Sequence, residues 1–170
     1  MAADESELMG RARERLSDLV SVPDIDAALS AIWLNMLGRR HAVLIQSVSR
    51  SVELDENEAA IILALGLQAP RALTAAELKA TLMVTSGGIT RASDRLIDKG
   101  LVDRNEHPDD GRRVQLRLTA TGRRRFEKLL GTLVDRQEER LSQLSPERRL
   151  EILAALDDLL TLYADIDVPR

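Results

Sequence analysis

The sequence predicts a mainly α-helical fold with a small β-wing, and two observations support this prediction. Hydrophobic residues make up 44% of the 170 residues but aromatic residues only 2%, a composition that favours helices packed on helices. Within residues 73–119, two short helical patterns precede a hairpin with an Asp-Asp-Gly turn and an alternating strand. Two short helices and a two-stranded ribbon form a winged helix-turn-helix, a shape suited to duplex DNA.

Three helices are expected before this module. The first, residues 5–20, is short and amphipathic. The second, from about residue 24 to 51, follows Pro23, which favours a first helical turn. The third, about residues 55–67, carries an almost continuous apolar run and should therefore be buried on most sides.

Local signals set the start of the module. Residues 71–73 are expected to form a stub of strand. Thr74 then caps a helix over residues 75–82, because Glu77 stands three residues on and completes a capping box.

The second short helix and the wing follow. Either Thr85 or Ser86 caps this helix, which ends at Gly100, a residue type favoured just beyond a helix. The wing strand after it should be half buried, because Val114, Leu116 and Leu118 alternate with Arg113, Gln115 and Arg117.

Two more long helices are expected after the wing. Residues 119–122 open the first, and Ser145-Pro146 begins the second. Their apolar stripes contain Phe126, Leu130, Leu133, Val134, Leu141 and Leu144, and then Leu153, Leu156, Leu160 and Tyr163. The long terminal helices have more apolar surface than the small module can cover. They either form an intramolecular bundle or interlock with those of a second chain.

The expected organisation has three parts. Residues 1–21 form an extra N-terminal helix, and residues 53–121 form the winged helix-turn-helix DNA-binding lobe. Residues 22–52 and 122–165 are the long dimerisation helices that flank the lobe.

The charge distribution is compatible with DNA binding although the net charge is −4. Seven acidic residues stand against three arginines in residues 1–26, so residues 27–170 are neutral overall. Within them, basic residues gather on the hairpin and the helix after it: Arg112, Arg113, Arg117, Arg123, Arg124, Arg125 and Lys128. A local basic patch is what a site-specific DNA binder requires.

Composition argues against several other classes. The chain has no cysteine, so it has no disulfide or thiolate metal site, and two isolated histidines make a metal-sensing regulator improbable. No nucleophile motif or phosphate-cradling loop is present, so we expect neither an enzyme nor a cofactor. No apolar run approaches a membrane span, and no signal-peptide core is present, which favours a cytoplasmic protein with no membrane partner.

The segment LKATLMVTSGGITRASDRLIDKGLVDRNEHPDDGRRVQLRLTATG resembles the MarR family of dimeric winged-helix regulators. The correspondences are Arg95-Leu96, Lys99-Gly100-Leu101-Val102, the wing from His107 to Arg112, and Leu118-Thr119 with Gly122. The resemblance implies a homodimer that binds a pseudo-palindromic operator, acts as a repressor and is released by a small aromatic or acidic ligand.

The extra N-terminal helix and the stretch from Leu82 to Gly87 look like the urate-responsive branch of that family. That branch uses a tryptophan in the extra helix and an aspartate on the helix corresponding to residues 55–67. Here the first tryptophan is Trp33, and the aspartate position is apolar, at Ala60 or Ile61. The sequence therefore departs from the urate-binding pattern.

The second short helix is the expected recognition helix. Ser86, Gly87 and Gly88 open it, and their N–H groups can donate hydrogen bonds to a phosphate. Thr90 and Arg91 project from its first turns, where base edges are read. Arg91 either reads guanine, contacts phosphate or pairs locally with Asp94, and Arg95 is either a DNA contact or structural. Ser86, Gly87 and Gly88 are also compatible with an ordinary capped helix start.

The wing supplies the other expected contacts. Arg112 stands directly after the tight turn, where a guanidinium can enter the minor groove. Asp110 would orient it, or serve only the turn. Arg113 is expected to contact phosphate or to be a solvated charge.

Effector binding is expected from Trp33, Met36, Arg40 and His41, on successive turns of the first long helix. The MarR resemblance implies a cavity where the long helices meet the DNA-binding lobe. The alternative is core packing by Trp33 and Met36 with a solvated Arg40. The alternative for the whole chain is a winged-helix protein-interaction module without sequence-specific DNA binding.

Overall fold

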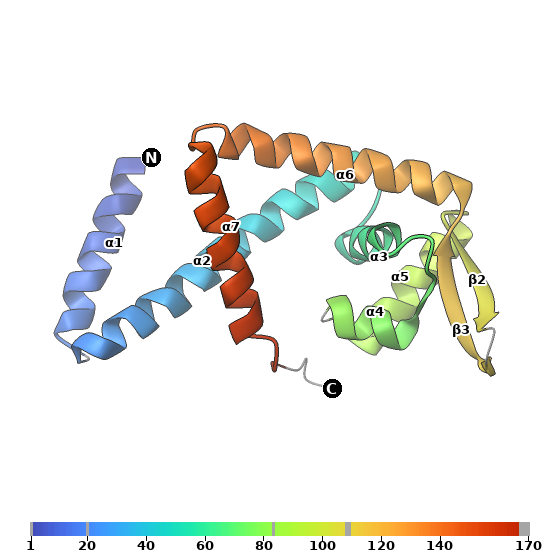
Figure 1. Ribbon diagram of the computed structural model, residues 1–170, viewed down its shortest axis with the longest axis horizontal. Helices are drawn as coiled ribbons and strands as arrows, with labels where there is room; N and C mark the ends of the chain where they lie inside the picture. The colour runs from blue at the N-terminus through green and yellow to red at the C-terminus, as the bar shows by residue number, and fades with distance from the viewer. Residues whose placement is uncertain (1, 20, 83, 108–109, 167–170) are drawn as a thin grey trace. The chain divides into compact units, whose positions relative to one another are not determined.

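The computed structural model describes residues 2–19, 21–82, 84–107 and 110–166, apart from the side chains of residues 2–6, 8, 22–23, 106–107 and 110–113. In chain order the elements are α1 (Ala2–Ser17), α2 (Val22–Ser51), α3 (Glu56–Leu67), β1 (Leu73–Thr74), α4 (Ala75–Leu82), α5 (Ser86–Asp98), β2 (Val102–His107), β3 (Asp110–Leu118), α6 (Ala120–Leu141) and α7 (Pro146–Leu162) (Figure 1). The mainly helical fold with a small β-wing is confirmed. The chain divides into two compact units, residues 1–44 and 45–170.

The first unit contains α1 and most of α2. Both helices were expected, and α2 begins at Val22, which places Pro23 in its first turn. Ile25 and Leu29 of α2 are buried. The Trp33 indole N–H donates to the sulfur of Met9 in α1, and the two atoms are 2.7 Å apart.

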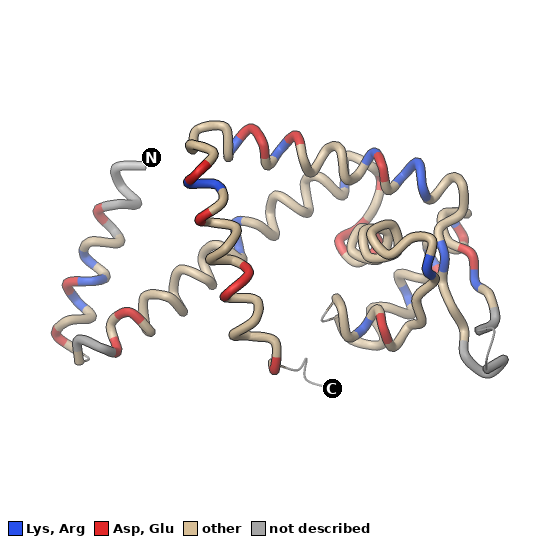
Figure 2. Tube along the Cα trace, in the orientation of Figure 1, with Lys and Arg blue, Asp and Glu red and all other residues tan. Residues whose placement is uncertain are grey.

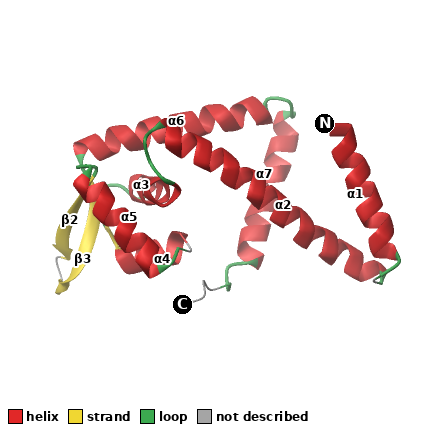
Figure 3. Cartoon of the chain, turned by 180° about the vertical axis from the view of Figure 1, so that it is seen from behind, coloured by secondary structure: helices red, strands yellow, loops and turns green. Residues whose placement is uncertain are grey.

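The second unit is built around α3, which contacts α4, α5, α6 and β3 (Figures 1 and 3). Ile61 and Ile62 of α3 are fully buried, as the continuous apolar run predicts. Helix α6 approaches α3 at Gly66, where a Cβ would lie 2.2 Å from the ring of Phe126. The core of the unit therefore consists of α3 and the elements that pack against it.

The sheet has three antiparallel strands in the order β1-β3-β2. Leu73 of β1 pairs with Leu116 of β3, and Val102 of β2 pairs with Leu118. Leu116 and Leu118 are buried, as expected, but Val114 is 41% exposed. The prediction that Val114 belongs to the buried face is therefore wrong. Strand β1 pairs only with residues 115 and 116 of β3. The buried part of β3 is therefore shorter than the stretch in which apolar and polar residues alternate.

Polar side chains fix the starts of three helices in the second unit. The Thr74–Glu77 capping box is confirmed, because Glu77 Oε2 accepts the Thr74 N–H at 2.7 Å and Thr74 Oγ1 accepts the Glu77 N–H at 3.2 Å. Asp55 and Glu58 form a second capping box at α3. Thr85, rather than Ser86, caps α5 by accepting the Gly88 N–H.

The last helix has no buried residue. Ser145 caps it and Pro146 occupies its first position, as expected. Leu150, Leu153 and Leu160 are 59–73% exposed. The expected excess of apolar surface on the terminal helices is therefore present. None of the described helices combines the length and apolarity needed to cross a membrane.

Candidate nucleic-acid interface

Helix α5 is strongly two-sided, with one face in the core and one in solvent. Ile89, Ala92 and Leu96 are buried, which anchors the helix on α3 and the sheet. The opposite face is polar and exposed and consists of Ser86, Gly87, Thr90, Arg91 and Asp94. The exposed face therefore includes four of the predicted DNA-contacting residues.

The start of α5 separates the roles of its two glycines. A Cβ on Gly88 would lie 2.8 Å from the Val84 side chain, so a larger residue here would force Val84 to shift. A Cβ on Gly87 would meet nothing within 4 Å, so this position is open to an approaching group. Thr90 Oγ1 donates to the Ser86 carbonyl at 3.0 Å. The first turn thus presents exposed N–H groups without a side chain at Gly87 to cover them.

Arg91 projects from the exposed face and makes no ion pair within the part of the chain that the structure describes. The local pair with Asp94 that the sequence allowed is wrong. Asp94 instead accepts from Arg104 Nη2 of strand β2 at 3.0 Å, because the wing lies beside α5. Because Arg104 is paired with Asp94, the Arg91 guanidinium is available for a ligand.

Arg95 lies one turn after Arg91 but has different surroundings. Its Nε donates to Glu58 Oε1 at 3.0 Å, and its Nη2 is paired with Asp55. The carboxylate of Glu58 is the main cause that raises the pKa of Arg95, and Asp55 adds to it. These are the contacts expected if Arg95 has a structural role, the alternative to a DNA contact.

The wing consists of β2 and β3. Asp110, Arg112 and Arg113 belong to the β3 backbone, but their side chains lie outside the part of the chain that the structure describes. Nearer the base of the wing, Arg117 is exposed and its backbone pairs with Asp103 of β2.

Arginines at the start of α6 lie beside the strands (Figure 2), and the structure separates their roles. Arg125 donates to the carbonyl of Val52 and pairs with Glu53, which fixes α6 to the turn after α2. Arg123 Nη1 is 3.4 Å from the Leu118 carbonyl oxygen. Arg124 is exposed and donates to Thr121 Oγ1 at 3.1 Å. Arg125 is therefore a structural residue, which the sequence could not distinguish from its neighbours.

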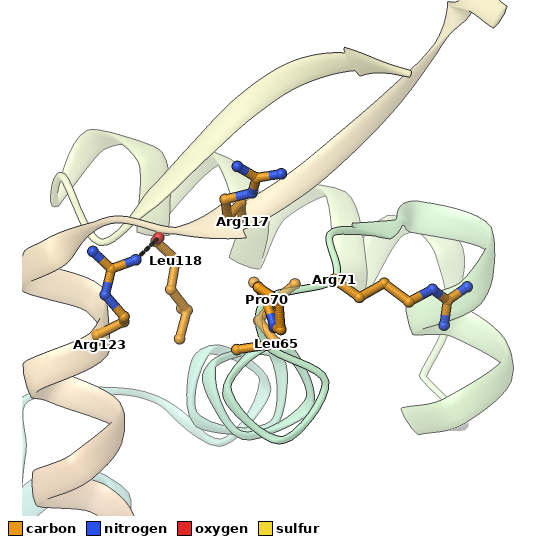
Figure 4. Close-up of a pocket in the computed structure, with 7 residues that line it drawn as sticks. Leu65, Pro70, Arg71, Arg117, Leu118 and Arg123 are labelled. Atoms are coloured by element: carbon orange, nitrogen blue, oxygen red, sulfur yellow. Dashed lines mark hydrogen bonds between the residues drawn. The ribbon is translucent and has the colours of Figure 1, made fainter. Parts of the chain in front are cut away.

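Cavities lined by described residues of the second unit include the following two. The smaller, about 130 Å³, has apolar residues and Arg71, Arg117 and Arg123 in its lining. Their guanidinium groups lie apart, and that of Arg71 extends away from the pocket (Figure 4), so they do not converge on one anion. The larger, about 240 Å³, lies between α5 and the wing and is lined by Ala75, Ile89, Thr90, Ser93, Arg104, Val114 and Leu116.

The residues predicted to bind an effector lie in the first unit. Trp33 is 46% exposed, Met36 is half-buried, and Arg40 and His41 are exposed. The alternative that Trp33 packs in a core is therefore wrong for this chain by itself. Among the described residues, no group of three His, Asp or Glu side chains is arranged to hold a metal ion.

Residues 52–113, which run from the end of α2 into the wing, match the model of the MarR family. These residues, about a third of the chain, are therefore similar to the winged helix-turn-helix of MarR-family proteins. The multiple antibiotic resistance protein MarR of Escherichia coli (strain K12) is 46% identical over 50 residues, which are 29% of this chain and 35% of that protein.

Solved structures extend the likeness beyond these residues. A mutant of Escherichia coli MarR complexed with operator DNA has a TM-score of 0.66 and 23% identity, covering 83% of this chain and 99% of that one. NadR in complex with 4-hydroxyphenylacetate has a TM-score of 0.67 and 25% identity, covering 80% of this chain and 92% of that one. The fold, including long helices around the module, is thus that of MarR-type proteins.

The sequence interpretation did not identify Glu58, Lys99 or Arg104 as parts of this site. A signal existed for Glu58, because the spacing of Asp55 and Glu58 before an apolar run is a capping-box pattern. No local signal indicates its partners, because Arg95 and Lys99 are 37 and 41 residues away in sequence.

Proposed function

We propose that the chain is a sequence-specific DNA-binding transcription regulator. It acts in the cytoplasm as a homodimer on a pseudo-palindromic operator, as a repressor that a small ligand releases. The observation that supports this best is the exposed polar face of α5, with an unpaired Arg91 within the described chain, beside a two-stranded wing.

The two parts of the module suit the two grooves of duplex DNA. A helix laid in the major groove reads base edges with residues of its first turns, which here are Thr90 and Arg91. A ribbon tip with arginine reaches the minor groove, where the negative potential is concentrated, and Arg112 is placed for this by its sequence position. Gly87 and the exposed N–H groups near it would approach a phosphate.

A homodimer is supported by the apolar face of α7. Leu150, Leu153 and Leu160 are exposed in the single chain, and a contiguous apolar surface of this kind marks an interaction site. Two copies related by a twofold axis would cover it and would present two recognition helices to two half-sites.

The effector is proposed to be a small acidic or aromatic molecule. One similar structure, NadR, is in complex with 4-hydroxyphenylacetate. Besides the residues around Trp33, the 240 Å³ cavity between α5 and the wing is a candidate site, because Thr90 and Arg104 line it. A ligand there would occupy space next to the DNA-contacting face.

The experiment that tests the function is capture of genomic DNA fragments by the purified protein, followed by affinity measurements at several salt concentrations. Several phosphate contacts predict a steep loss of affinity with salt, with a slope of about −0.9 per phosphate neutralised. Arg112→Ala should weaken binding to a captured operator by roughly tenfold or more without dissociating the dimer.

Two results would contradict the proposal. One is failure of the protein to retain any genomic fragment in dilute buffer. The other is retention of fragments with no shared sequence and no discrimination between them and unrelated duplex. Failure to bind DNA would favour the winged-helix protein-interaction module.

A further inference from the structure

Glu58 is a carboxylate buried in the protein core with a side chain only 1% exposed. Glutamate is almost never fully buried unless it is paired, because a carboxylate loses its hydration on burial. Glu58 lies near the start of α3, the helix that contacts α4, α5, α6 and β3. Its partners therefore determine what this carboxylate does.

Two cations and one backbone group donate to the Glu58 carboxylate. Arg95 Nε donates to Oε1 at 3.0 Å, and Lys99 Nζ donates to Oε2 at 2.7 Å. The Asp55 N–H also donates to Oε2, at 2.9 Å, which completes the capping box of α3. Both oxygens are thus satisfied, and both cations come from the second half of α5 and its C-cap.

The other contacts of Arg95 and Lys99 are also with residues next to the start of α3. Arg95 Nη2 pairs with Asp55, and Lys99 Nζ donates to the Glu53 carbonyl at 3.2 Å. Glu53 lies in the turn between α2 and α3 and has a positive φ of 60°. The end of α5 is therefore fixed to the start of α3 through one central, buried carboxylate and weaker, more exposed partners.

Arg91 of the exposed face lies one helical turn before Arg95. Arg91 and Arg95 are four residues apart, so a rotation or tilt of α5 at Arg95 moves Arg91 as well. A side chain that reads a base needs its two hydrogen bonds within a narrow range of distance and angle. A side chain that contacts a phosphate tolerates larger displacement, because that attraction is less directional.

We propose that Glu58 is a positioning residue for DNA recognition: it holds Arg95 and Lys99 so that α5 presents Thr90 and Arg91 in the orientation that base reading requires. The inference rests on the proposed function. It assigns to Glu58 an effect on sequence discrimination that is larger than its effect on general DNA affinity.

The test compares Glu58→Gln with the native protein on two duplexes of equal length. One carries the operator captured by the native protein, and the other has an unrelated sequence. Glutamine keeps the size and can still accept the Asp55 N–H, but it removes the negative charge that compensates two cations. Operator affinity should fall at least tenfold, unrelated-duplex affinity should change by less than about twofold, and the salt slope should stay the same.

Glu56→Gln is the matched control. Glu56 lies on the same helix two residues earlier, is exposed and accepts from Gln46 Nε2 at 2.8 Å. The substitution makes the same change in net charge without touching α5. Both affinities should remain within about twofold of the native values.

A second variant covers the case in which Glu58→Gln does not fold, as circular dichroism and thermal unfolding would show. Lys99→Met removes one cation and leaves the capping box and the Glu58–Arg95 pair in place. The ratio of operator to unrelated affinity should then fall at least threefold.

An unchanged ratio in every folded variant would overturn the inference, as would equal losses on both duplexes. The native protein separates this failure from that of the proposed function. If the native protein does not prefer an operator to unrelated DNA, the proposed function is wrong. If the native protein has this preference but the variants keep the same ratio of operator to unrelated affinity, only the proposed role of Glu58 is wrong.

Discussion

Arg91 and Arg95 are one turn apart on α5, yet their surroundings assign them different tasks. Arg95 is bound to Glu58 and Asp55, so moving it to a DNA base would leave a buried carboxylate with one donor fewer. Arg91 is exposed and makes no ion pair among the described residues, because Asp94 is engaged by Arg104. Base reading on this helix is therefore expected mainly from Arg91.

Arg91→Ala should weaken binding to the captured operator by roughly 5- to 150-fold, which corresponds to the 1–3 kcal/mol of one bidentate base contact. It should also relax the preference at a single base-pair position in each half-site. Binding to an operator library measures both effects. Arg140→Ala removes the same charge from the far end of α6 and should change neither. Equal loss on every sequence would mean that Arg91 contacts only phosphate.

Individual residues differ in how far the sequence predicts them. The caps at Thr74 and Ser145 were predictable because a cap and its partner lie within a few residues. The ion pair of Asp94 with Arg104 was not, because it depends on the wing lying beside α5. The same holds for Glu58, whose partners come from a helix more than thirty residues away in the chain. Long-range pairing of charges requires the fold to be known first.

At the scale of elements, periodicity predicted every helix, because an apolar stripe or run shows which residues face the core. It predicted the strands less well. Strand β1 forms only two residues, and its position depends on pairing with β3. The Asp-Asp-Gly turn indicated the hairpin, but Val114 lies where the strand extends beyond the core. The alternation of apolar and polar residues in a strand does not show how much of the strand the core buries.

The junction of β3 and α6 depends on close approach at Gly122. A Cβ there would lie 1.9 Å from the Leu101 carbonyl oxygen. That oxygen also accepts the Thr119 N–H at 3.1 Å, so it cannot move without weakening the cap of α6. The start of α6 thus lies against the backbone of Leu101, just before β2, with no room for a side chain between them.

Gly122→Ala should therefore destabilise the protein by about 1–3 kcal/mol, the usual range for overpacking, and lower Tm by roughly 2–12 °C. Gly131→Ala on the same helix is the control, because its Cβ would meet nothing within 4 Å. It should stabilise the helix by about 0.5–1 kcal/mol. Thermal denaturation at equal protein concentration distinguishes the two signs. A gain in Tm for Gly122→Ala would contradict the packing of this junction.

For the whole molecule, the apolar residues of α7 are the feature that a single chain leaves unexplained. Leu153 and Leu160 are 59% and 73% exposed, although each would gain about 1.5–3 kcal/mol from full burial. In a twofold-symmetric dimer every such residue is buried twice, so a few leucines can contribute a large part of the association energy. A DNA site with two half-sites would be matched by the same symmetry.

The double substitution Leu153→Glu with Leu160→Glu should raise the dimer dissociation constant at least about 100-fold, because four carboxylates would enter the apolar interface. Operator affinity should fall with it, since a monomer contacts one half-site, whereas affinity for a half-site duplex should stay near the native value. Sedimentation velocity and duplex binding measure these effects. Asp158→Asn on the same helix should leave both unchanged. If the double variant stayed dimeric, α7 would not form the interface, and if it became monomeric but kept full operator affinity, DNA recognition would not require two copies.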